Sequence, residues 1–254
     1  MAVVLRSSRP ARVLDVDARA RLAALAPHIA PGALAAERAI EVHPALRALL
    51  PQGLVRGSTI NCTGGAATSS AFLLAAAASQ AGSWTGVAGL AHFGAQAAAE
   101  AGVELGRVVV VRERGSYDDG TWGQVLAALV DGFDVVVFGA AARVRSGTAR
   151  RVQARLQTRG AVLVLLGDAG GFSADLRVAS RCRWQGLGDG HGHLRAREVE
   201  LTVEGRRVPR PRRDTLWFPD AAGRITGRQA PTVSGASGAA PAATVPVVGL
   251  GRTG

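Results

Sequence analysis

Apolar runs of strand length alternate with alanine-rich stretches of helical length through the middle of the chain. Runs that are typical of buried strands occupy residues 58–62, 84–90, 107–111, 134–138 and 161–166. Predicted helices lie between them, at 68–80, 94–101, 121–129 and 147–157. Because parallel strands need a crossover connection that is usually a helix, this alternation predicts an α/β fold with a doubly wound, mostly parallel sheet.

The pattern changes after residue 167. Apolar and polar positions alternate at 176–184, 193–203 and 215–218, which predicts antiparallel strands linked by turns rich in glycine, arginine or proline. We expect these strands to form an antiparallel C-terminal extension at one edge of the sheet.

The two ends of the chain differ from this core. Apolar residues at mixed spacings of three and four predict helices at 17–25 and 32–50, and hence an N-terminal helical cap over residues 1–50. The core, with a basic C-terminal half, follows at 51–228. The tail, 229–254, has no aromatic residue and one charge, so we expect it to be disordered. The alternative is that its apolar island at 245–250 docks on a partner.

The amino-acid composition excludes several classes of protein. The 254 residues include 30 arginines and no lysine, which excludes any mechanism that needs a lysine. No apolar run is long enough to span a membrane, and the first residues lack the apolar region of a secretory signal. Cys62 and Cys182 are far apart and have no CxxC partner, which predicts two reduced thiols. We therefore expect a cytoplasmic protein that has no contact with membranes.

A strand-to-helix turn carries the first candidate for chemistry. Its small and hydroxyl-bearing residues are Gly64, Gly65, Thr68, Ser69 and Ser70. A working P-loop, GxxxxGK[ST], needs backbone N–H groups around the phosphates, a lysine and a hydroxyl for magnesium. Because the lysine is missing, these residues predict a vestigial P-loop that holds no cofactor. The alternative is an ordinary turn between a strand and a helix.

The other parts of a nucleotide hydrolase are also missing. A magnesium-binding acid is expected where the 134–138 strand ends, but Phe138 and Gly139 stand there. Asp134 precedes the strand, at the wrong end for such a ligand. His92 is the only titratable group that follows the second strand, and we interpret it as a loop or core histidine rather than a catalyst. The sequence therefore predicts no metal site and no hydrolytic activity.

Basic residues concentrate in the second half of the chain. Residues 141–228 hold 18 arginines against 8 acids, whereas residues 1–140 hold 11 of each, and the net charge is +11. Two groups stand out, one on the predicted 147–157 helix and one in a proline-containing loop: Arg150, Arg151, Arg155 and Arg159; Arg206, Arg207, Arg210, Arg212 and Arg213. Contact with DNA or with an acidic partner is one interpretation, and a solvated surface is the other.

Several segments together resemble the RecA-like core. They are the Pro51-Gln52-Gly53 turn, the glycine-bearing strand-to-helix turn, GVEL at 102–105 and the basic helix before VLVLLGD. More narrowly, residues 15–225, including the stretch from Arg183 to Arg197, resemble ImuA-type proteins, the RecA-like accessory members of the actinobacterial damage-induced mutagenesis cassette.

This resemblance implies a function that composition and spacing do not. It implies a non-catalytic accessory or scaffold protein in SOS-induced translesion DNA synthesis. Its implied partners are an ImuB-like Y-family polymerase homologue and an error-prone C-family polymerase. Weak, non-specific DNA binding and self-association are further expectations. The alternatives are a RecA-class ATPase or recombinase, and a non-specific DNA-binding protein that acts through its arginine-rich half.

Overall fold

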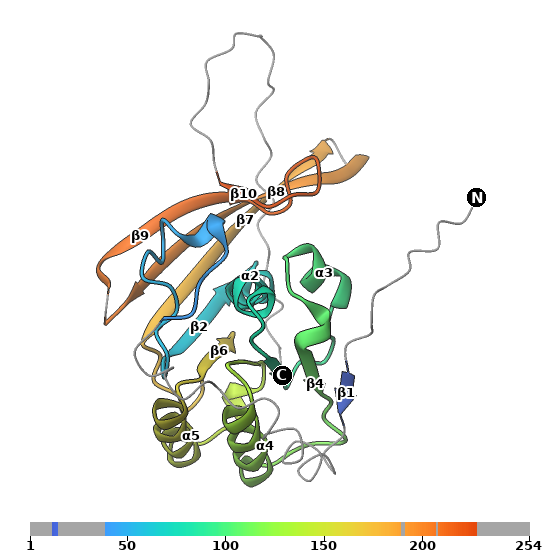
Figure 1. Ribbon diagram of the computed structural model, residues 1–254. Coiled ribbons are helices and arrows are strands. Elements are labelled where there is room, and N and C mark those ends of the chain that lie inside the picture. Colours follow the sequence, from blue (N-terminus) through green and yellow to red (C-terminus); the bar gives the residue numbers. More distant parts are fainter. Residues whose placement is uncertain (1–11, 15–38, 189–190, 207, 228–254) are drawn as a thin grey trace, which may run out of the picture.

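A computed structural model describes residues 12–14, 39–188, 191–206 and 208–227 (Figure 1). Its ten-stranded sheet has the order β1-β4-β3-β5-β6-β2-β7-β8-β9-β10. The strands are β1 (Arg12–Leu14), β2 (Thr59–Gly64), β3 (Thr85–Ala88), β4 (Val108–Val111), β5 (Val135–Phe138), β6 (Val162–Leu166), β7 (Leu176–Gly188), β8 (His191–Gly205), β9 (Val208–Trp217) and β10 (Thr226–Gly227). The α-helices are α2 (Ala67–Gln80), α3 (Ala95–Glu100), α4 (Asp119–Gly132) and α5 (Ser146–Arg159), and short 3-10 helices are η2 (Pro44–Leu46), η3 (Leu105–Arg107) and η4 (Ala141–Arg143).

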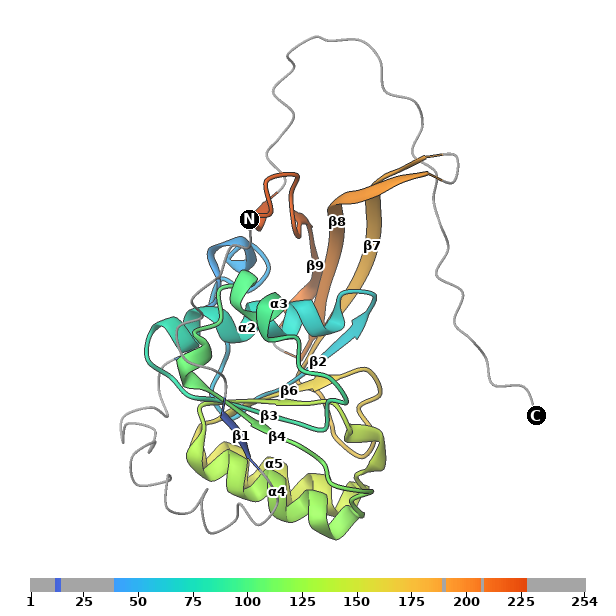
Figure 2. The same cartoon turned by 90° about the vertical axis from the view of Figure 1, so that its right-hand side faces the viewer.

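The first half of the sheet is parallel and is covered on both faces. Strands β1 to β6 pair only in parallel with one another. One apolar cluster joins the sheet to α2 and α3, and a second joins the other face to α4 and α5. Figure 2 shows the two helix pairs on opposite sides of the strands. The predicted α/β fold with a mostly parallel sheet is therefore confirmed.

The predicted elements of this half are all present, and their ends shift by a few residues. The largest change is in α4, which begins before the predicted residue 121 and extends beyond residue 129. Asp118 explains the early start, because its Oδ1 accepts a hydrogen bond from the backbone N–H of Thr121 at 2.7 Å. Helix α5 ends at Gly160, whose φ of +70° is a conformation that glycine adopts readily.

The extension of the sheet begins with β7, which pairs in parallel with β2. Strands β8 and β9 then add antiparallel, which confirms the predicted extension. The prediction of a loop over the second arginine group was wrong, because most of that segment lies in β9. Pro209 and Pro211 are two residues apart, so both missing N–H groups face the same side of the strand. Among the described residues that side of β9 is an edge there, where a proline removes no ladder bond.

Part of the predicted N-terminal cap can be compared with the structure. The sequence predicts a helix over 32–50 that is interrupted near Pro44. The interruption is present, but the helix is wrong for the described part of this segment. Ile40 and Leu54 exchange two backbone hydrogen bonds of 2.8 Å, and Pro44 then starts a single 3-10 turn. Turns rather than a helix bury Leu46 and Leu49 against the sheet, because Pro44 favours a new helical start at this point. The predicted helix 17–25 and the tail 229–254 lie outside the described residues.

We predict that Gly64→Ala lowers the free energy of unfolding by more than about 2 kcal/mol, measured by urea denaturation. Gly64 has a φ of +89°, and a Cβ there would collide with the backbone oxygen of Ser180 on β7. Gly82→Ala is the matched control, because Gly82 has a φ of +96° but open space around it. Equal losses of stability in the two variants would show that the contact between β7 and this turn does not cause the loss.

Candidate functional site

The turn between β2 and α2 is the candidate site that the sequence singled out. Strand β2 ends at Gly64 and helix α2 begins at Ala67, so only Gly65 and Ala66 connect them. The predicted order of strand, small-residue turn and helix is present. A P-loop surrounds its phosphates with a longer glycine-rich loop, and two connecting residues cannot form one.

Ser180 of β7 closes this turn from the side. Its hydroxyl donates a hydrogen bond of 2.7 Å to the carbonyl oxygen of Thr63 and accepts one of 2.9 Å from the backbone N–H of Ala66. The backbone N–H of Ala66, which could otherwise have faced an anion, is therefore already hydrogen-bonded within the protein. A side chain that comes from more than a hundred residues along the chain holds the turn in a fixed shape.

The first turn of α2 has no negative group of its own. Ala66 occupies the N-cap position without a side-chain cap, and the first turn contains no acid. Thr68 is exposed, whereas Ser70 is buried and its hydroxyl has no hydrogen-bond partner among the described residues. The residues of the vestigial P-loop thus lie together at the end of β2 and the start of α2.

Arg197 of β8 supplies a cation beside this helix. Its Nη2 donates to the hydroxyl of Ser69 at 3.0 Å, and its Nε donates to the carbonyl oxygen of Phe218 at 2.6 Å. The guanidinium carbon lies 5.2 Å from the ring centroids of both Trp184 and Phe218. Sequence reasoning missed this residue. The signal that could have identified it is the register of the hairpin, which places Trp184 opposite Arg197. A single sequence does not determine that register.

Burial governs the titration of the groups around Arg197. Removal from water lowers the pKa of Arg197 and raises the pKa of Cys182, and the nearby guanidinium partly opposes the rise at the thiol. Burial raises the pKa of Cys62 on β2 to about 12. Both thiols are therefore protonated at neutral pH and are weak nucleophiles. In this cluster two aromatic rings lie against the guanidinium of Arg197, and neither thiol is an activated nucleophile.

The other residues that were considered for a hydrolase site, Asp134, Phe138 and His92, lie apart from one another. Asp134 accepts a hydrogen bond of 3.1 Å from Arg56 and one of 3.4 Å from the backbone N–H of Trp84, at the edge where the parallel strands begin. Phe138 is fully buried at the other end of β5, and His92 is exposed in the loop after β3. The structure therefore places no carboxylate at the end of β5.

Two of the four arginines on α5 form ion pairs within the protein, and a third donates a hydrogen bond to a neighbouring side chain. Arg155 and Arg159 both form ion pairs with Asp131 of α4, the second at 3.1 Å. Burial alone would raise the pKa of Asp131, but the two guanidinium groups outweigh it and hold that pKa below its usual range. Arg151 donates to the hydroxyl of Thr148 at 3.0 Å, and Arg150 is exposed. The helix therefore presents less free positive charge than its sequence indicates.

The second arginine group lies on another part of the sheet. Arg212 donates to the carbonyl oxygen of Leu49 at 3.1 Å, whereas Arg206, Arg210 and Arg213 are exposed. Arg207 lies outside the described residues. Strand β9 is three strands beyond β2 in the sheet, and α5 packs beside α4 over the parallel half. The two arginine groups thus lie on different elements, one on helix α5 and the other on the extension of the sheet.

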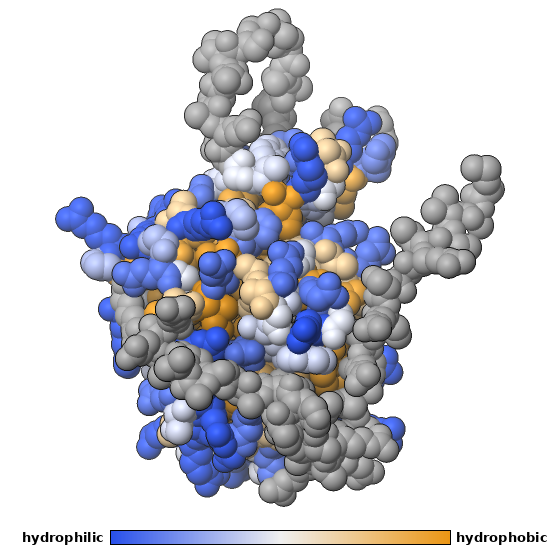
Figure 3. All heavy atoms as spheres, in the orientation of Figure 1, coloured by the Kyte–Doolittle hydropathy of each residue, from blue (hydrophilic) through white to orange (hydrophobic). Residues whose placement is uncertain are grey.

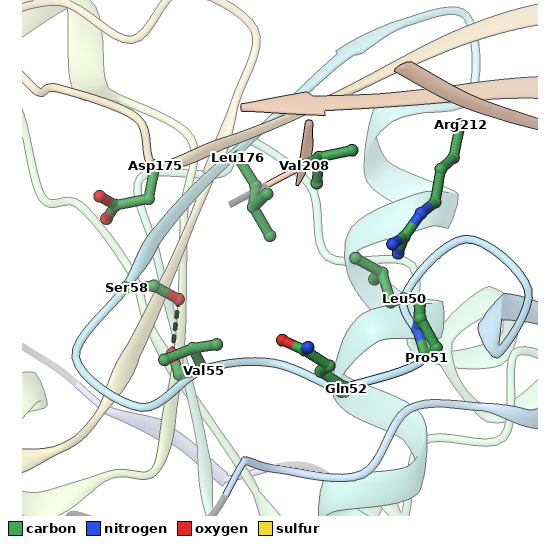
Figure 4. Close-up of a pocket in the computed structure, with 10 residues that line it drawn as sticks. Leu50, Pro51, Gln52, Val55, Ser58, Asp175, Leu176, Val208 and Arg212 are labelled. Atoms are coloured by element: carbon green, nitrogen blue, oxygen red, sulfur yellow. Dashed lines mark hydrogen bonds between the residues drawn. The ribbon is translucent and has the colours of Figure 1, made fainter. Parts of the chain in front are cut away.

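Arg212 also lines a small pocket between β9 and the segment before β2 (Figure 4). Leu50 and Leu176 are among its apolar walls, and Gln52 points into the space from the opposite side to Leu176. The cavity volume is about 40 Å³. Pockets that hold cofactors usually exceed about 300 Å³, so this space suits a few water molecules.

Within the described ranges, no group of three or more His, Cys, Asp and Glu residues is placed to hold a metal ion. Over the same residues, no helix combines the length and the apolar character needed to cross a membrane.

Comparison with known proteins gives one match. Residues 48–171 match the model of the MT3502 N-terminal domain family. The chain is similar to this family. The match includes β2 to β6 and ends before β7, so it covers the parallel part of the sheet together with α2 to α5. No curated protein matches the chain.

We predict that Arg197→Gln moves the pH midpoint of Cys182 alkylation to higher pH. The positive charge lowers the pKa of this thiol, so its loss leaves only the raising effect of burial. The rate of alkylation of the folded Cys62→Ser protein, measured against pH, gives the midpoint. An unchanged or lower midpoint would show that Arg197 does not act on Cys182. Arg195→Gln, on the same strand, is the control.

Proposed function

We propose that the protein is a non-catalytic, RecA-like accessory protein of SOS-induced translesion DNA synthesis. In this role it recruits or organises polymerases, and an ImuB-like Y-family polymerase homologue is its direct partner. The error-prone C-family polymerase joins through the same assembly. The proposal combines the resemblance of the sequence with the geometry of the β2–α2 turn.

The arrangement of the sheet supports the RecA-like part of the proposal. The order β4-β3-β5-β6-β2-β7-β8-β9, with β8 antiparallel to its neighbours, is compatible with the RecA-like core that the sequence resembles. The turn that corresponds to the P-loop then follows β2, where sequence reasoning placed it. Fold alone does not assign an activity, so the site must carry the functional argument.

The β2–α2 turn supports the part of the proposal that assigns the protein no catalytic activity. Phosphoryl transfer is catalysed mainly by positioning and by positive charge on the phosphates, with a metal ion that bridges them. Here the turn is two residues long, and the backbone N–H of Ala66 already donates to Ser180. Strand β5 ends in Phe138 rather than in an acid. These features favour an accessory role over a RecA-class ATPase or recombinase.

A non-specific DNA-binding role has weaker support. Arg155 and Arg159 share Asp131, which neutralises part of the charge on α5. Arg150 is exposed on helix α5, whereas Arg210 and Arg213 are exposed on strand β9. Any DNA binding through these residues is therefore expected to be weak and strongly dependent on salt.

We predict that the purified protein does not hydrolyse ATP above background, with or without single-stranded DNA. The missing lysine and the missing acid after β5 each remove stabilisation of the transition state, and such losses typically cost about a hundredfold or more in rate. Release of inorganic phosphate measures the activity. Turnover that DNA stimulates and that Ser69→Ala abolishes would contradict the proposal, with Ser83→Ala as the control for an unrelated serine.

We predict that the tagged protein, recovered from DNA-damaged cells, co-purifies with a Y-family polymerase homologue. Quantitative mass spectrometry of the recovered proteins measures the enrichment over an untagged strain, before and after damage. Enrichment of the polymerase homologue after damage is the expected result. Recovery that lacks every translesion polymerase, while the bait itself is abundant, would contradict the proposal.

A further inference from the structure

The hairpin formed by the end of β7 and the start of β8 extends beyond the body of the molecule. We call its described residues, 181–188 and 191–197, the arm. Figures 1 and 2 show these two strands continuing past the last strand that lies beside them. The pairing is irregular near Gly186, where a Cβ would collide with the backbone of His193 and of Arg195. The arm is therefore a two-stranded ribbon with a bulge.

Both edges of the arm are open within the described residues. Strand β2 pairs with β7 only as far as Ser180, and β9 pairs with β8 only from Glu198. The chain beyond β9 adds backbone hydrogen bonds to Arg197 and no further. An isolated two-stranded ribbon is marginally stable in water, and an unpaired edge is a template for another strand.

The arm also exposes large apolar side chains. Trp184 is 45% exposed and Leu194 is 48% exposed, and they are the exposed large hydrophobic residues among those that the structure describes. Figure 3 shows hydrophilic and hydrophobic residues side by side at the projecting end of the molecule. Tryptophan and arginine are the residue types most enriched among the energetic centres of protein interfaces.

The two faces of β7 in the arm have different chemistry. Side chains alternate along a strand, so Arg181 and Arg183 face one side while Cys182 and Trp184 face the other. Arg183 is held only loosely by Glu198, at 3.7 Å, and Arg181 is exposed. A strand added beside β7 would meet an apolar face and a basic face at alternate residues.

Among the described residues, β7 has no pairing partner on this side beyond the end of β2. Chain direction changes at Gly64, and both Gly64 and Gly65 are exposed beside the open edge of β7. The added strand would lie in line with β2 and continue its pairing along Arg181 and the residues that follow. Residues 181–197 include four arginines, two histidines and one aspartate, and Glu198 and Glu200 lie opposite Arg183 and Arg181. The hairpin therefore keeps a small net positive charge, which favours an acidic occupant.

We propose that the open edge of β7 in the arm binds an extended segment of another protein in which acidic residues alternate with apolar ones. The segment adds a strand beside β7, with its apolar side chains against Trp184 and its carboxylates against Arg181 and Arg183. This inference rests on the proposed function in one respect, because it names the surface on which a protein partner docks.

Two other occupants fit these observations less well. A second copy of the chain would bring two positively charged arms together, which like-charge repulsion disfavours. Single-stranded nucleic acid could stack on Trp184 and contact the arginines, but it would make no use of the unpaired backbone edge.

The test is a titration of the full chain into short fluorescent peptides, followed by anisotropy. The probe is a capped ten-residue peptide in which Glu alternates with Val. One control peptide has Lys in place of every Glu. A second carries N-methyl groups on alternate residues, which remove the donors needed to pair with β7. Saturable binding of the Glu-Val peptide alone is the expected result.

Variants of the protein locate the site. Trp184→Ala and Arg181→Glu should each weaken binding of the Glu-Val peptide by about tenfold or more, because each removes a side chain on one face of the added strand. Trp84→Ala and Arg150→Glu are the matched controls and should leave binding unchanged. Trp84 also stacks against an arginine, with 5.4 Å between the guanidinium carbon of Arg107 and the ring centroid, and Arg150 is an exposed arginine on α5.

Other outcomes would overturn the proposal. Absence of saturable binding, or equal binding of the N-methylated peptide, excludes strand addition at this edge. Tighter, Trp184-dependent binding of an oligothymidylate identifies a nucleic-acid surface instead. A dimer in sedimentation that Trp184→Ala dissociates identifies a second copy as the occupant. None of these results requires the polymerase partner, so failure here is distinguishable from failure of the recruitment experiment.

Discussion

The parallel pairing of β7 with β2 is the constraint on which the rest of the structure depends. It joins the parallel half of the sheet to the antiparallel extension, and it aligns Ser180 with the end of β2 at Gly64. The same pairing brings the serine hydroxyl onto the β2–α2 turn and directs β7 past the body of the molecule. One register therefore determines both the closed turn and the projecting arm.

Local pattern was sufficient to predict β2 to β6 of the parallel half, but not β1, which lies in the segment that was predicted as a helical cap. Strands such as Val108–Val111 and Val135–Phe138 are short, continuous and apolar, and each helix between them is long enough to be recognised. Prediction failed where tertiary structure overrides local preference. Proline at 209 and 211 suggested a loop, but β9 has a free edge there that tolerates both residues.

The candidate site could be predicted only in part. The turn at Gly64 and the missing acid after β5 follow from local sequence. Ser180 and Arg197 do not, because each reaches the turn or α2 from more than a hundred residues along the chain, through a register that one sequence does not fix. The arginines of α5 also looked freer in sequence than they are, since Asp131 lies on a different helix.

We propose that the start of α2 does not bind nucleotide phosphates. Equilibrium dialysis of the full-length protein against labelled ATP and magnesium tests this claim most directly, because it measures binding whether or not hydrolysis follows. The account predicts no saturable binding up to millimolar nucleotide. One molecule of ATP bound per chain with micromolar affinity, lost in Ser69→Ala, would contradict it.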